Sequence, residues 1–299
     1  MTRLSKIIAA QGKFLLENYW HAFLCALVFS LLPYAAWLSS VLIALVTLRR
    51  GEREGGVILL AVLIAHTIFS VAYLPANVAA AQTALFFIPC YVAAFLLRIT
   101  KSWRAVAAGL FVLAMMMVFV VQLFMPSVIA AQFQLFKMIL KELKADTHLL
   151  ELVRIDPLFV ANILFGIQTT VIVLSAVISL MAARWLQSLI YYPGGFGWEM
   201  RNFRADKIGL FLLGIVLIAA YFDMVLAINL LPLLMFYFVM AGLSLGYNLL
   251  AQKKPLGTFF LLITPVIFLP YVMLPFYLVF GSLDSLFNFR IYLAKRARK

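Results

Sequence analysis

The stretch 158–190, LFVANILFGIQTTVIVLSAVISLMAARWLQSLI, decides the fold of this chain. It contains no charged residue before Arg184. A helix rises about 1.5 Å per residue, so one of this length is longer than the roughly 30 Å hydrocarbon core of a bilayer. The stretch therefore predicts a membrane-spanning helix.

The composition of the whole chain agrees with that prediction. Of its 299 residues, 66% are hydrophobic and only 12% are charged, with a mean hydropathy of +1.08. A soluble domain carries about 25% charged residues, which keep its surface dispersed in water. We therefore expect the lipid bilayer to be the main partner of this protein.

Other apolar runs repeat the pattern along the chain. Residues 20–47 form a run that is too long for one span and contains Pro33, which predicts a hairpin broken at 32–34. Residues 256–287 contain three prolines and predict a second broken hairpin. The remaining expected spans are 56–74, 78–97, 105–125, 158–190, 208–221 and 224–250.

This pattern predicts an all-α fold, a polytopic transmembrane helical bundle that forms a single domain over 1–299. We expect about ten crossings, or about eight if both hairpins are re-entrant. Two amphipathic segments accompany the spans. Residues 1–19, without a signal-peptide cleavage site, predict an interfacial helix, and 126–157 predict a surface helix outside the cytoplasm.

The basic residues are distributed unevenly between the two sets of loops. We assign one set of loops, together with both termini, to the cytoplasm. In that assignment 20 of the 24 Lys and Arg residues are cytoplasmic, and the other four lie within 126–157. This asymmetry predicts that both termini are cytoplasmic. No soluble basic module is present, so we expect no nucleic-acid partner. The cytoplasmic segments are the N-terminus, 49–53, 98–104, 184–207, 253–254 and the tail 290–299.

Polar residues inside the expected spans are candidates for a ligand site, because polar side chains are unfavourable in hydrocarbon. Two interpretations are open: they line a cavity for a small molecule, or they form hydrogen bonds between helices. The candidate residues are Asn162, Gln168, Thr169 and Asn229.

The polar and aromatic stretch 191–206 is expected to be a cytoplasmic loop. Its aromatic residues either anchor the chain at headgroup depth or form a surface for partner docking or gating. Glu199 is expected to pair with a nearby arginine, and Asp284 with Arg290 near the tail. The candidate residues of the loop are Arg184, Tyr192, Gly195, Trp198, Glu199 and Arg201.

No pattern in the sequence indicates an enzyme. The three histidines, His21, His66 and His148, are scattered without carboxylate or cysteine neighbours at metal-ligand spacing. Cys25 and Cys90 lie inside apolar runs, and no phosphate-binding glycine loop is present. We expect no catalytic residues, no metal and no cofactor.

Three groups of short motifs resemble a known family. They are ARWLQ at 183–187 with YPGGFG at 192–197, MAGL at 240–243, and GSLD at 281–284 with FNFR at 287–290. Their order is similar to that in the bacterial YybS-like family of integral membrane proteins. That family is distantly similar to the S-components of energy-coupling-factor transporters and to MreD.

The resemblance implies a bacterial inner-membrane protein. Its similarity to S-components implies small-molecule binding or transport. The alternative, implied by MreD, is a membrane scaffold that recruits a cytoplasmic or membrane protein.

Overall fold

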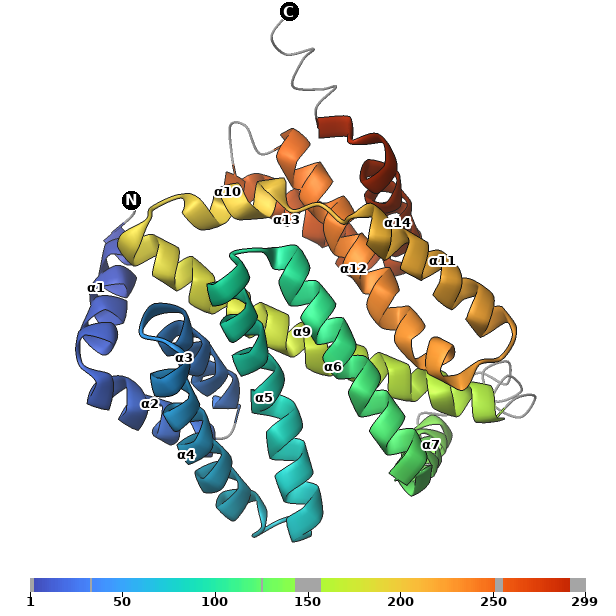
Figure 1. Ribbon diagram of the computed structural model, residues 1–299, viewed down its shortest axis with the longest axis horizontal. Helices are drawn as coiled ribbons and strands as arrows, with labels where there is room; N and C mark the ends of the chain where they lie inside the picture. Colours follow the sequence, from blue (N-terminus) through green and yellow to red (C-terminus); the bar gives the residue numbers. More distant parts are fainter. Residues whose placement is uncertain (1–2, 33, 125, 143–156, 251–254, 291–299) are drawn as a thin grey trace, which may run out of the picture. The chain divides into compact units, whose positions relative to one another are not determined.

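The computed structural model describes residues 3–32, 34–124, 126–142, 157–250 and 255–290. These residues form helices and no β-strand, as expected for an all-α protein (Figure 1). The chain divides into two compact units, which are described separately below. One unit comprises Met1–Leu110 and Val171–Glu199, and the other comprises Phe111–Thr170 and Met200–Lys299.

Six helices in the described part of the chain are long and apolar enough to cross a membrane, and four shorter helices are also apolar. Each of the ten expected apolar spans is occupied by one of these helices, and the protein is a multi-pass α-helical membrane protein. The six long helices are α4 (Glu52–Ser70), α5 (Ala76–Thr100), α6 (Trp103–Phe124), α9 (Pro157–Tyr191), α12 (Val225–Leu250) and α14 (Pro270–Phe287).

The first unit is built around one buried helix, α3 (Ala36–Arg49), which packs against α4, α5 and α2 (Tyr19–Leu31). Every residue of α3 from 39 to 48 is buried. Ile43 and Val46 of α3 pack with Phe87 of α5 in the same apolar cluster. A helix that is apolar on all sides belongs at the centre of a bundle, which explains its position here.

The first predicted hairpin is confirmed. Helix α2 ends at Leu31 and α3 begins at Ala36, with Tyr34 in the left-handed region at φ 63°. The two helices have 13 and 14 residues, so each is about 20 Å long. That length falls short of the roughly 30 Å hydrocarbon core, so neither helix alone would cross it perpendicularly.

The N-terminal helix α1 (Arg3–Glu17) matches the expected interfacial segment in position. It packs against the end of α9: a Cβ atom at Gly12 would lie 2.8 Å from Ile190 Cδ1 and 3.1 Å from Leu186 Cδ1. Leu16 is buried, whereas Phe14 is exposed. This one-sided burial is that of an amphipathic helix.

The second unit is held together by close packing of α12 against α14. A Cβ atom on Gly242 would lie 2.0 Å from Tyr277 O, and one on Gly281 would lie 2.1 Å from Phe238 O. Only glycine permits backbones to approach this closely. The unit also contains α7 (Pro126–Glu142), α11 (Lys207–Tyr221) and α13 (Pro255–Phe268).

The last predicted hairpin is confirmed, but only one of its prolines marks the break. Helix α13 ends at Phe268 and α14 begins at Pro270, whereas Pro265 and Pro275 lie inside these helices. A proline inside a membrane helix is tolerated where neighbouring groups satisfy the freed carbonyl.

Helix α7 confirms the amphipathic part of the expected surface segment. Phe133 and Leu140 are buried against Ala161 at the start of α9, and the amine of Lys137 lies 4.4 Å from the Phe133 ring centroid. The remainder of that segment, from 143 to 156, falls outside the described residues. The same is true of 253–254 and of the tail after Arg290.

The stretch 191–206 contains a short helix where a loop was expected. After α9 ends at Tyr191, the chain turns through Gly194 at φ 90° and forms α10 (Gly195–Asn202). The glycines that suggested a loop supply the turn and the first residue of this helix. This helix gives the candidate residues of the stretch a regular backbone.

Candidate functional site

Arginine side chains bind the carbonyl ends of helices in the first unit. Arg98 donates from Nη1 to Thr47 O (3.1 Å) and Leu48 O (2.9 Å), at the end of α3. Arg50 donates from Nη2 to Leu16 O (2.6 Å) and Glu17 O (2.9 Å), at the end of α1. The last carbonyls of a helix lack partners inside it and carry partial negative charge, so a guanidinium stabilises them.

These contacts bring several of the basic segments to one end of the first unit. The Arg49 guanidinium lies 4.1 Å from the ring centroid of Tyr191, so the end of α9 joins the ends of α1, α3 and α5. The segments that the charge distribution grouped together are therefore neighbours in this unit. Each arginine contributes a helix-end contact in addition to its charge.

At the same end, Glu199 of α10 is held by two side chains. Arg184 Nε lies 3.1 Å from both carboxylate oxygens of Glu199, and Arg184 Nη2 also donates to one of them. Trp103 Nε1 donates to Glu199 Oε2 at 2.9 Å, and Gln187 accepts from Arg184 at 2.6 Å. The ion pair predicted for Glu199 is confirmed, with Arg184 as its partner.

Trp103 is a site residue that the sequence reasoning missed. It lies 96 positions before Glu199, and its indole is only half-buried. No local pattern connects a tryptophan at the start of one helix with a glutamate in another. A tryptophan beside the basic residues 101 and 104 reads as an interfacial anchor instead.

Two aromatic side chains that are close to Glu199 in sequence lie on the surface of the first unit. Tyr192 is 76% exposed and Trp198 is 64% exposed. The backbone between them is fixed by hydrogen bonds from Gly195 N to Tyr192 O (2.9 Å) and from Trp198 N to Gly194 O (3.2 Å). We call Tyr192 and Trp198 the aromatic face.

In the second unit, Arg290 gathers the carbonyls that end α10. It donates from Nη2 to Phe203 O (2.6 Å) and from Nη1 to Arg201 O. Ser244 Oγ lies 2.6 Å from Met200 O, and Asn248 Nδ2 donates to Arg201 O at 3.0 Å. Arg201 thus enters this network through its backbone.

The predicted pair of Asp284 and Arg290 is confirmed. Arg290 Nε lies 3.0 Å from Asp284 Oδ2, and the two side chains are 12% and 0% exposed. The other carboxylate oxygen, Oδ1, is buried and has no hydrogen-bond partner among the described residues. A buried carboxylate needs its countercharge, so this pair fixes the end of α14.

The four candidate ligand residues have different surroundings. Asn229 Nδ2 donates to Asn162 Oδ1 at 3.0 Å, and both residues are buried where α12 meets α9. Thr169 donates to Phe165 O within its own helix. Gln168 is exposed and accepts a hydrogen bond from Gln132 of α7.

This arrangement has the form of hydrogen bonding between helices, the second interpretation of these residues. A Cβ atom at Gly166 would lie 2.5 Å from Asn229 O, so the backbones of α9 and α12 are close at this point. Asn162 is buried, whereas Gln168 is exposed, so the four candidates do not line one common site. The side chains of Asn162 and Asn229 therefore form a hydrogen bond with each other between α9 and α12.

Three hydroxyl groups in the first unit stand out as polar and buried. Ser39, Ser40 and Thr83 are 0%, 2% and 1% exposed. Their side-chain oxygens have no hydrogen-bond partner within the part of the chain that the structure describes. Cys90 Sγ lies 3.5 Å from Ser40 O, which places Ser40 at the contact between α3 and α5. Buried hydroxyls without partners are unfavourable unless water or a ligand satisfies them.

No three His, Cys, Asp or Glu side chains of the described residues lie together in a way that could hold a metal ion.

The helical architecture and the apolar spans define the class of this protein, a multi-pass α-helical membrane protein. No family model, no curated protein and no solved structure matches the chain.

Proposed function

We propose that this protein is a non-catalytic scaffold of a bacterial inner membrane, with both termini in the cytoplasm. The proposed docking surface is the aromatic face, Tyr192 and Trp198, at the basic end of the first unit. The observation that supports it is that Arg184 and Trp103 hold Glu199, the residue after Trp198, while Tyr192 and Trp198 are exposed.

The anchoring of α10 has a physical consequence for binding. A helix of eight residues has too few internal hydrogen bonds to be stable by itself. Here Glu199 is fixed by charge-assisted bonds, so the aromatic face is ordered before a partner arrives. A partner then loses less conformational entropy on binding, and tyrosine and tryptophan supply large contact areas.

The test is mild purification of the intact protein, followed by mass spectrometry of its bound proteins and small molecules. We expect a stoichiometric protein partner that is lost in Trp198→Ala. The matched control is Trp37→Ala, because Trp37 is also exposed but lies at the start of α3, away from the arginine-bound end. Equal retention by Trp198→Ala and by the unaltered protein would reject the docking surface.

The second candidate function is small-molecule binding of the S-component type. The observation that favours it is the set of buried hydroxyls without partners, Ser39, Ser40 and Thr83. In this proposal a polar solute accepts or donates hydrogen bonds there. A metabolite that copurifies with the protein, and is lost in Ser40→Ala and Thr83→Val, would support it. Retention of that metabolite by both variants would exclude this site.

A further inference from the structure

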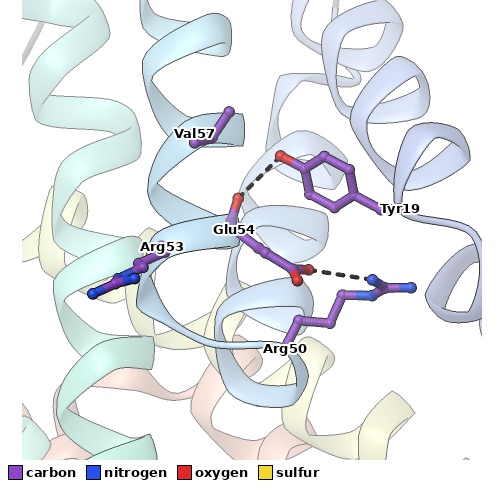
Figure 2. A pocket seen from close by; sticks show the side chains of 5 residues that line it. All are labelled: Tyr19, Arg50, Arg53, Glu54 and Val57. Carbon is purple, nitrogen blue, oxygen red and sulfur yellow. Dashed lines mark hydrogen bonds and ion pairs between the residues drawn. The ribbon is translucent and has the colours of Figure 1, made fainter.

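A shallow pocket opens in the first unit beside the first turns of α4. It has a volume of about 460 Å³ and is lined by Tyr19, Arg50, Arg53, Glu54 and Val57 (Figure 2). The Tyr19 hydroxyl donates a long hydrogen bond, 3.5 Å, to Glu54 O. A donor held this weakly remains available to a better acceptor in the pocket.

One of the two arginines in the pocket is already engaged. Arg50 Nη1 lies 3.3 Å from Glu54 Oε2, and its other nitrogens hold the carbonyls of Leu16 and Glu17. The positive charge of Arg50 is therefore balanced by Glu54 and by the end of α1. Replacement of Arg50 would disturb α1 as well as the pocket.

The second arginine is arranged differently. Arg53 is exposed, and its guanidinium points away from the Arg50–Glu54 pair (Figure 2). Within the described residues no hydrogen bond or ion pair involves this side chain. With two guanidiniums and one carboxylate, the lining carries an excess of one positive charge, which an anion would neutralise.

Apolar surface begins where the pocket ends. Val57, Leu60, Ile64 and Ile68 form a row along one side of α4 and are 52%, 60%, 62% and 70% exposed. A residue spacing of three or four places them on one face of the helix. Helix α2, which packs against α4, begins beside the pocket at Tyr19 and also exposes apolar side chains to the surroundings.

We propose that this pocket binds the phosphodiester headgroup of an anionic phospholipid of the phosphatidylglycerol type. On binding, the exposed Arg53 side chain turns toward the pocket and pairs with the phosphate, the Tyr19 hydroxyl donates to a phosphate oxygen, and an acyl chain lies along the apolar row that starts at Val57. A single excess positive charge next to a continuous apolar face matches one anionic lipid better than a soluble anion.

The test compares two variants of the purified full-length protein in detergent. Native mass spectrometry measures the binding of phosphatidylglycerol, of phosphatidylcholine and of inorganic phosphate. The variants are Arg53→Gln and, as a matched control, Lys101→Gln, because Lys101 is an exposed cation of the same unit outside the pocket. Equal melting temperatures establish that both variants fold.

We expect Arg53→Gln to weaken phosphatidylglycerol binding about fivefold, the effect of one basic residue at a membrane surface. Lys101→Gln should bind this lipid like the unaltered protein, and phosphatidylcholine binding should be equal in all three. An equal loss in both variants, or no loss in Arg53→Gln, would overturn the proposal. Displacement of the lipid by inorganic phosphate at a similar concentration would reject a lipid as the source of the phosphate group.

Discussion

Replacement of Arg290 by glutamine should destabilise the second unit far more than the loss of an exposed ion pair. In the structure Arg290 holds the buried carboxylate of Asp284 and the carbonyls of Arg201 and Phe203. Removal of one partner of a buried pair leaves an uncompensated charge and typically costs about 3–5 kcal/mol. We therefore expect Arg290→Gln to lower the free energy of unfolding by about that amount.

The control is the pair of Lys13 and Glu17, which are each 63% exposed and 3.5 Å apart. An exposed pair of this spacing contributes about 0.3–0.5 kcal/mol, so Lys13→Gln should be nearly neutral. Denaturant titration of both variants in one detergent, followed by circular dichroism, measures the difference.

A double-mutant cycle then isolates the pair itself. Asp284→Asn added to Arg290→Gln should recover part of the lost stability, because the unpaired charge is removed. If Arg290→Gln were as mild as Lys13→Gln, or the two changes at 284 and 290 were additive, the reasoning would be refuted.

Three further changes test other contacts by the same titration. Gly281→Ala should lose about 1–3 kcal/mol because its Cβ meets backbone, whereas Gly214→Ala, with nothing within 4 Å, should be neutral or slightly stabilising. Asn229→Leu should lose about 0.6–2 kcal/mol, and adding Asn162→Leu should lose little more, because the pair is already broken; additive losses would argue against the pair. Arg98→Gln should lose about 1–2 kcal/mol by freeing the carbonyl end of α3, and an unchanged stability would contradict this role.

Much of the fold follows from the sequence because lipid imposes a simple rule. Each backbone polar group must be satisfied within its own helix, so apolar runs become helices and their ends follow hydropathy. The break between α2 and α3 was predicted because the run 20–47 is too long for one span and contains Pro33, which lacks a backbone donor. The position of the break in the last hairpin was harder to predict, because tertiary contacts decide which proline interrupts a helix.

The side-chain contacts of the site could be predicted only where the two contacting residues are close in sequence. Glu199 and Arg184 are 15 positions apart, and Asp284 and Arg290 are six apart, and both pairs were expected. Trp103 is far from Glu199 along the chain, and Arg98 is far from the carbonyls to which it donates. No local sequence pattern therefore predicts these contacts. The close approach of Gly242 to Tyr277 in α14 is likewise set by the tertiary fold.

The most direct test of the proposed docking function is photo-crosslinking in native membranes. A photoreactive amino acid replaces Trp198 in one version of the protein and Trp37 in another, both exposed in the first unit. The account predicts one defined protein adduct from position 198, absent from position 37 and reduced when Glu199→Gln releases α10 from Arg184. Only lipid adducts from position 198, or the same protein adduct from both positions, would contradict it.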